Sequence, residues 1–436
     1  AWQYVTAAKK PKYLVAIAPA CSSPQFFDDA VAINGVPMFE SRETPYAGEC
    51  PPPGPAPAGA PRLEPVDTDK DGVLLKSAQE ERRCNAVMLG QYYRHMPRDG
   101  MNAYDAYRPG IEDSAISHAP AIKASGIAIL QIGGWFDAAG FGQMASQSYW
   151  GGRVIMGPWV HGNGIPRGAD FPAGKLDLDA ETLRWFDHHA RGLKNGAEKP
   201  GVLYYTINAA AGREWKSADK WSWRGDRQLA LHFGADGLQA TAPGPLQPIT
   251  YAGRDVPVWG GRFQPLNRWS AQDMNSSDAQ SLSQDGVPFA ADTEVTGTPV
   301  ARLWISADNR DANIYAFLED VAPDGRSTRV TDGRIRASWR KTHPAAWGEA
   351  SQHWHRGYSE DIQPLTPGEP VELVFDLSPV SYVFKAGHRP RVSLSTSIGE
   401  KYQAPPLAEG RHPTIRLHRE PGRASSIELP IVTGAE

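Results

Sequence analysis

An aspartate and a histidine follow two apolar runs in the segment IAILQIGGWFDAAGFGQMASQSYWGGRVIMGPWVHG, residues 127–162. Asp137 comes just after the run that ends in Gly-Gly, and His161 comes just after the run that ends at Gly157. A buried aspartate can hold a histidine in one tautomer, and that histidine can then take a proton from a nucleophile. The residue types therefore predict two members of a three-part catalytic device, with Asp137 orienting the base His161.

Simpler roles fit the same two residues. An aspartate after a strand is often a turn former or a helix N-cap. A histidine beside a glycine is often an ordinary loop residue. The spacing by itself leaves both interpretations open.

A nucleophilic serine is the third member that such a device needs, and the 436 residues contain no G-x-S-x-G sequence. Ser327 (GRSTR) and Ser359 (GYSED) each have one neighbouring glycine, but both follow the histidine, which is the wrong order. Ser22 and Ser23 follow an early apolar run without the tight strand-to-helix turn of a nucleophile elbow. The residues alone therefore do not identify the third member.

The elements that must position the pair are those of a parallel sheet. Residues 127–133 and 153–157 are short apolar runs typical of buried strands, and FGQMASQSYW between them has the length of a helix. Strand, helix and strand predict a parallel pair in an α/β sheet, whose carboxyl ends are the usual ligand site. The spacing of 24 positions from Asp137 to His161 leaves room for that helix and strand.

Flanking segments extend this part of the chain. The first residues predict a helix, and Tyr13–Ala18 predicts a buried strand. DLDAETLRWFDHHARGLKNG has acidic residues at its start, apolar residues on one face and glycines at its end, which together predict a helix.

The pattern changes after about Trp223. Short alternating or apolar runs, separated by Gly, Pro, Asn and Asp, predict an all-β sandwich or jelly roll. The runs are QLALHF, ARLWISA, IYAFLEDV, VELVFDLS and RVSLSTS.

Residues 38–119 form a third kind of segment. The prolines of CPPPGPAPAGAPR predict a loop or linker, and DGVLLKSAQEERRCNAVMLGQYY shows helical spacing. This segment is predicted to be a helical insertion. DTDKDG, residues 67–72, matches half of a calcium loop, but Ala78 stands where that loop needs glutamate, and turns that cap the next helix explain it as well. His353 and His355 in HWH could face one side of a strand, as zinc ligands do, without any supporting cysteine or carboxylate cluster.

Composition bounds the function. The net charge of −4, from 45 basic and 49 acidic side chains, gives no electrostatic footprint for nucleic acid or an anionic membrane. No apolar run approaches the roughly 18 residues of a membrane span. The chain has three cysteines, Cys21, Cys50 and Cys84. Three is an odd and low number, so a disulfide scaffold is not expected. The cellular compartment cannot be derived from these features.

Several motifs resemble those of the cocaine esterase / X-Pro dipeptidyl-peptidase (CocE/NonD) hydrolases, in the same order along nearly the whole chain. They are GGWFDAAG, VIMGPWVHG, LRWFDHHARGLKNG, REWKSADKW, ADTEVTGTPVARLWISAD, LEDVAPDGRSTRVTDG and SPVSYVFKAGHRPRVSLSTS. The catalytic aspartate of that family follows a GW-aromatic motif, and its histidine closes G-P-W-x-H. The resemblance therefore implies that Asp137 and His161 are these two residues. Trp135 and Trp159, which flank the pair, would line an acyl pocket or pack in the core.

The resemblance also implies where the serine lies. AWQYVTAAKKPKYLVAIAP is similar to the helix and strand that follow the family's elbow, roughly G-x-S-Y-x-G. The serine is then expected a few residues before Ala1, together with the first strands of the sheet and the tyrosine of the oxyanion hole. A longer protein or a separate chain would supply them, and the chain alone is expected to be inactive.

The fold expected overall is α/β plus all-β. Residues 1–37 and 120–223 would form a partial α/β-hydrolase domain that lacks its N-terminal strands, 38–119 a helical cap insertion, and 224–436 a C-terminal jelly roll. The expected function is hydrolysis of a small ester or amide through an acyl-enzyme, with no metal and no organic cofactor. The alternatives are an X-Pro dipeptidyl peptidase acting on peptides, a β-lactam acylase, or a non-catalytic binding protein on a decayed hydrolase.

Overall fold

The computed structural model divides the chain into two compact units, which we describe separately. One unit is Ala1–Met38 together with His95–Glu436, and the other is Phe39–Arg94. The structure describes residues 2–37, 63–83, 97–100, 108–112, 114–166, 169–197, 199–256, 273–345, 353–398, 405, 407–408 and 412–433. Among these residues, no helix has both the length and the apolar character needed to cross a bilayer.

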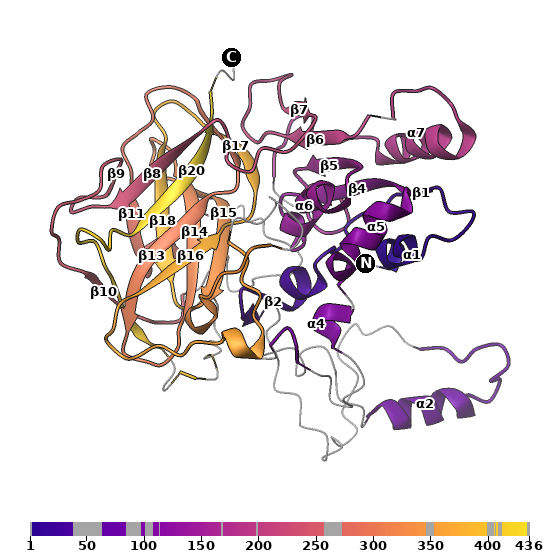
Figure 1. The fold of residues 1–436 in the computed structure, drawn as a ribbon, viewed down its shortest axis with the longest axis horizontal. Coiled ribbons are helices and arrows are strands. Elements are labelled where there is room, and N and C mark those ends of the chain that lie inside the picture. The colour runs from indigo at the N-terminus through magenta and orange to yellow at the C-terminus, as the bar shows by residue number, and fades with distance from the viewer. Residues whose placement is uncertain are drawn as a thin grey trace. The chain divides into compact units, whose positions relative to one another are not determined.

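A five-stranded mixed sheet forms the α/β part of the first unit (Figure 1). Its order is β1-β4-β5-β6-β7; the first four strands are parallel, and β7 is antiparallel. The strands are β1 (Ala16–Ile17), β4 (Ala128–Gly134), β5 (Arg153–Gly157), β6 (Gly201–Tyr205) and β7 (Trp215–Ala218). The predicted parallel pair of strands is therefore confirmed as β4 and β5.

Gly134 pairs with Gly157, so β4 and β5 end side by side. Both glycines lie in close contact with Trp159. A Cβ on Gly134 would collide with the Trp159 carbonyl, and a Cβ on Gly157 would collide with the Trp159 ring. Gly133 is equally tight, because a Cβ there would collide with Gln143 and Met156. The close approach that these glycines allow brings the loops after the two strands into contact.

Helices of the first unit include α6 and α7, which pack against strands of this sheet. The predicted helices are confirmed, and α6 connects β4 to β5. Asp177 caps the first turn of α7 through a bond from the Ala180 N–H at 2.9 Å, and Gly192 ends that helix in the left-handed region. The helices are α1 (Trp2–Ala8), α4 (Pro109–Glu112), α5 (Ala119–Ser125), α6 (Gly140–Trp150) and α7 (Leu178–Arg191), with a π-helical turn η1 (Phe27–Val31) and a 3₁₀ turn η2 (Ala115–His118).

The remainder of the first unit is β-rich, as the change of pattern after Trp223 predicts. Within the described residues, nine strands make one sheet and four make another with the order β11-β18-β14-β15. All nine residues of β14 are buried, so this strand is central to the core. The strands are β8 (Arg227–Phe233), β9 (Leu238–Gln239), β10 (Ile249–Ala252), β11 (Leu282–Asp285), β12 (Thr293–Gly297), β13 (Val300–Ala307), β14 (Asn313–Val321), β15 (Ser327–Arg336), β16 (Val371–Asp376), β17 (Val380–Phe384), β18 (Arg389–Ser395), β19 (Thr414–Leu417) and β20 (Ser426–Val432).

Among the residues of this region that the structure describes, helical structure is confined to short turns. They are α8 (Asn275–Asp278), η3 (Ala337–Trp339) and η4 (Ser359–Asp361). A small hairpin, β2 (Ala32–Ile33) with β3 (Val36–Pro37), reaches the β-rich part, where Asn34 Nδ2 donates to Arg334 O at 3.0 Å.

Backbone bonds join the mixed sheet to the β-rich part directly. The Ile207 N–H donates to Ser381 O at 2.9 Å, and the Val383 N–H donates back to Ile207 O at 2.9 Å. Lys216 and the buried Glu294 add an ion pair beside this junction. These two hydrogen bonds attach the segment that follows β6 to strand β17.

The described portion of the second unit contains α2 (Val73–Arg83). Its first turn is capped by Asp69, whose two carboxylate oxygens accept from the Leu74 and Leu75 N–H groups at 2.9 and 2.8 Å. DTDKDG is therefore a capping turn, as its turn-forming alternative predicts. The proline-rich stretch 50–62 and the helical pattern over 84–93 lie outside the described residues, and the three domain boundaries stay a prediction.

Candidate active site

Asp137 is a buried carboxylate at the end of β4, with 1% of its surface exposed. The chain turns tightly there, because the Asp137 N–H bonds to Gly134 O and the Gly140 N–H bonds to Asp137 O, both at 3.1 Å. Its Oδ1 accepts from the Ala139 N–H at 3.1 Å, and its Oδ2 accepts from Gln143 Nε2 at 3.0 Å. These donors stabilise a charged carboxylate in one orientation.

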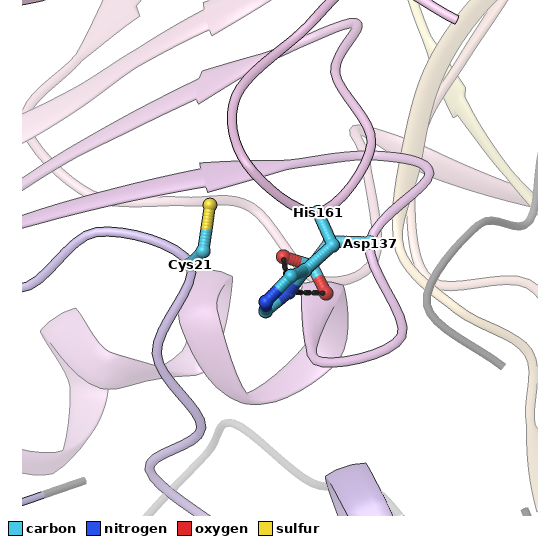
Figure 2. Close-up of side chains that lie close together, drawn as sticks. All are labelled: Cys21, Asp137 and His161. Atoms are coloured by element: carbon cyan, nitrogen blue, oxygen red, sulfur yellow. Dashed lines mark hydrogen bonds and ion pairs between the residues drawn. The ribbon is translucent and has the colours of Figure 1, made fainter. Parts of the chain in front are cut away.

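His161 lies beside this carboxylate (Figure 2). Its Nδ1 is 3.4 Å from Asp137 Oδ1 and 3.3 Å from Oδ2. The predicted proximity is therefore confirmed, at a distance slightly longer than a well-formed N–H···O bond. A proton on Nδ1 that faces the carboxylate leaves the lone pair on Nε2, the nitrogen that would act as base.

The loop that carries His161 is tightly folded. The Val160 N–H donates to Gly164 O and the Asn163 N–H donates to Val160 O, both at 3.0 Å. Gly162 and Asn163 have positive φ, at 91° and 58°. The side chain of His161 is 43% exposed, so the imidazole is open to small molecules while its partner carboxylate is not.

Cys21 is a third reactive side chain at this place, and the sequence interpretation missed it (Figure 2). It follows β1 and has a φ of 47°, in the left-handed region. Its Sγ accepts from the Gly162 N–H and donates to Asn163 Oδ1, both at 3.0 Å. The end of the strand predicted at 13–18 was the signal that could have found it, since parallel strands end at one edge.

The thiol of Cys21 is not activated as a nucleophile in this arrangement. Burial raises its pKa, and the nearby Asp137 charge acts in the same direction, against the bond from Gly162. Its hydrogen is directed to Asn163 instead of His161. Catalytic thiols have lowered pKa values, so Cys21 differs from them.

Three of the four serines considered from the sequence donate their hydroxyls to carboxylates: Ser23 to Asp29, Ser327 to Glu319 and Ser359 to Asp99. The exclusion of all four as the nucleophile stays a prediction.

Gln143 supports the site and was not singled out from the sequence. It is fully buried on α6, where its Nε2 donates to Asp137 and its Oε1 accepts from the Gly134 N–H at 3.2 Å. One amide thus connects the helix, the end of β4 and the carboxylate. An i to i+6 spacing from the aspartate is the only sequence signal, and it is a weak one.

Trp135 and Trp159 are both buried, with 5% and 2% of their surface exposed. The Trp135 indole N–H donates to Tyr205 O and that of Trp159 donates to Gly174 O. Their rings pack against Trp221 and Trp215, with centroids 5.6 and 5.9 Å apart. The packing alternative accounts for both side chains, and a part in acyl binding stays a prediction.

A small pocket of about 70 Å³ adjoins the turn that carries Asp137. It lies between that turn, the segment from Gln25 to Asn34 and the β-rich part. Its lining residues include Ala138, Phe141, Asp29, His353 and Asp376. His353 Nδ1 is 2.8 Å from Asp376 Oδ1 there.

HWH does not form the zinc site considered from the sequence. His355 is buried, and its two ring nitrogens lie 2.9 and 3.0 Å from the carbonyl oxygens of Trp339 and Val374. His353 lies against a carboxylate instead. Neither histidine lies in a described strand, which removes the period-2 argument for a shared face.

The sequence profile of the X-Pro dipeptidyl-peptidase C-terminal non-catalytic domain matches residues 195–428, which is more than half of the chain. The chain belongs to the cocaine esterase / X-Pro dipeptidyl-peptidase (CocE/NonD) family of hydrolases. One relative, a protein of Mycobacterium bovis named as a serine esterase, is 31% identical over 410 residues, covering 85% of this chain. The cocaine esterase of Rhodococcus sp. is 27% identical over 319 residues, covering 64% of this chain and 51% of that protein.

The solved structure of an α-amino acid ester hydrolase has the same fold, with a TM-score of 0.66 at 17% identity. The superposition covers 98% of this chain and 74% of that one. The chain spans 63% of the length of the M. bovis relative.

Proposed function

We propose that this chain supplies the histidine base and its orienting aspartate to a serine hydrolase that cleaves a small ester or amide bond. The observation that carries the proposal is the Asp137–His161 pair, in which a carboxylate with 1% exposure faces Nδ1 of a half-exposed imidazole. The two residues follow adjacent parallel strands, which is where α/β sheets hold reactive groups.

The scaffold proposed for the whole protein is an α/β-hydrolase domain with a helical cap and a jelly roll. Within the described residues, β1 pairs on one side only, with β4, so further strands can add at its other side. The nucleophilic serine would lie outside these 436 residues, on an elbow brought to His161 by such strands. The absence of G-x-S-x-G from the chain and its 63% share of the M. bovis relative support this.

His161 would take the proton of the serine hydroxyl through Nε2 as the hydroxyl attacks the substrate carbonyl, and later give it to the leaving group. Asp137 would stabilise the imidazolium that forms, while remaining ionised itself. Its bonds from Ala139 and Gln143 fix the carboxylate before the reaction begins, so little reorganisation is needed in the transition state.

An assay with a longer version of the chain that carries the elbow tests the proposal. That version should hydrolyse a p-nitrophenyl ester with an acyl-enzyme burst and lose activity to a fluorophosphonate. Asp137→Asn should lower kcat by about 10³–10⁴-fold, which is about 4–5.5 kcal/mol of transition-state stabilisation. An X-Pro p-nitroanilide and a β-lactam in parallel assays distinguish the peptidase and acylase alternatives.

The 436-residue chain alone should be inactive on the same substrates. If it turns over the ester at a comparable rate and His161→Ala abolishes that rate, the nucleophile lies within the chain. Cys21→Ser would then be the first variant to measure. A longer version that binds ester without turnover would support the non-catalytic alternative instead.

A further inference from the structure

Three different metal-ligating groups meet at the edge of the mixed sheet. One ligand atom from each of Cys21, Asp137 and His161 lies within 4.8 Å of the other two. Over the part of the chain that the structure describes, this is the one group of three or more such side chains. Figure 2 shows that the three side chains lie close together and come from separate segments of the chain.

Thiolate, imidazole and carboxylate are the ligand types that Zn²⁺ selects. Zinc bonds of about 2.0–2.3 Å to these atoms place neighbouring ligands roughly 3.3–3.7 Å apart in a tetrahedron. The 3.3 Å between His161 Nδ1 and Asp137 Oδ2 already has this length, while it is long for a hydrogen bond. The Sγ atom of Cys21 would need to move by little more than about 1 Å toward the other two ligand atoms for all three distances to match a tetrahedral site.

The surroundings fit an ion that enters from solvent. His161 is 43% exposed, which leaves an open path and a position for a fourth, water ligand. Asp137 is held from behind by Gln143 and the Ala139 N–H, the kind of support that metal-binding carboxylates have. Cys21 is held to the His161 loop only through its own Sγ, so the thiol can turn once that pair of bonds is exchanged for a metal bond.

We propose that Cys21, Asp137 and His161 form a binding site for a thiophilic divalent cation, with Zn²⁺ as the probe. Binding replaces the thiol hydrogen: a Zn–S bond forms, the S–H bond breaks, and one proton passes to solvent. The carboxylate binds through an existing lone pair, and the imidazole binds through Nδ1 once its proton has moved to Nε2, so no electron transfer is involved. Since the proposed function uses the same imidazole and carboxylate, the bound ion would inhibit hydrolysis reversibly.

Direct binding tests the site without any activity measurement. We would treat the 436-residue chain with a chelator, remove the chelator and titrate the chain with Co²⁺, then displace Co²⁺ with Zn²⁺. One equivalent should bind and give the near-ultraviolet charge-transfer band of a thiolate–cobalt bond. Cys21→Ser should lose that band while it keeps the wild-type circular dichroism spectrum, because a serine hydroxyl can also accept from the Gly162 N–H.

A matched control tests whether the other two cysteines contribute to Co²⁺ binding. The double variant Cys50→Ser/Cys84→Ser retains Cys21 as its single cysteine and should bind Co²⁺ as the wild type does. His161→Ala should weaken Zn²⁺ binding by at least about tenfold, since even loss of a group that merely supports a ligand has an effect of that size. A thiolate band that survives Cys21→Ser, or no saturable Co²⁺ binding to the wild type, would overturn the proposal.

The longer, elbow-carrying version separates this inference from the proposed function. Zn²⁺ should inhibit its esterase activity, and Cys21→Ser should relieve the inhibition. If Co²⁺ binds through Cys21 but the longer version has no esterase activity, the metal site stands and the proposed function fails. If activity is present and Zn²⁺ neither binds nor inhibits, the metal site fails and the hydrolase stands.

Discussion

Replacing Gln143 with leucine should destabilise the first unit strongly, because two buried hydrogen bonds depend on one amide. The bond from Nε2 to the Asp137 carboxylate is charge-assisted, and such bonds contribute about 1.5–3 kcal/mol. The Gly134 N–H would lose the acceptor Oε1, and a buried donor left without a partner costs about 1–3 kcal/mol. Together the free energy of unfolding should fall by about 2.5–6 kcal/mol.

Gln147→Leu provides a matched control one turn later on α6. Its side chain also makes two bonds, to Asp219 O at 2.9 Å and from the Trp221 N–H at 3.4 Å, but the first of these is exposed. Water can replace an exposed partner, so this variant should cost less than about 1.5 kcal/mol.

Urea unfolding followed by tryptophan fluorescence measures both variants on the 436-residue chain. The Gln143→Leu midpoint should shift well below that of Gln147→Leu. In the longer version, Gln143→Leu should also lower kcat, since Asp137 loses one of the donors that orient it. Equal stability of the two variants would refute the assignment of Gln143 as the support of Asp137.

Three further predictions concern other parts of the chain. Gly134→Ala should lower the thermal midpoint, because the new Cβ would overlap the Trp159 carbonyl and such overpacking costs about 1–3 kcal/mol. Gly164→Ala should leave the midpoint unchanged, because the space around Gly164 is open. Asp69→Ala should cost α2 about 0.5–2 kcal/mol and speed amide exchange over 73–83, with no change if the two capping bonds are unimportant. Burial acts to raise the pKa of Asp361. Hydrogen bonds from basic side chains outweigh burial and hold this pKa well below its usual value. Its stabilisation should therefore be intact at pH 5 and be lost as the pH falls below about 4, and Asp361→Asn should flatten that acid limb of the unfolding midpoint against pH.

Local chemistry made much of the α/β part predictable. The apolar runs 127–133 and 153–157 predicted buried strands, and FGQMASQSYW between them, with few breakers, predicted the helix that the structure shows as α6. Parallel strands end at a common edge, so the proximity of Asp137 and His161 followed from chain order alone. Asp177 and Gly192 marked the ends of α7 for similarly local reasons. The period-2 runs after Trp223 gave the β-rich part in the same way.

Tertiary structure decided the features that depend on residues distant in sequence. Cys21 reaches Asp137 and His161 across more than a hundred residues, because β1 pairs with β4. No pattern around Cys21 specifies that neighbour, since sheet order is set by the packing of whole strands. Trp135 and Trp159 could face either a pocket or the core, and only the partners of their indole N–H groups showed packing. Sequence specifies which groups can react, but the pairing of distant strands determines which of them meet.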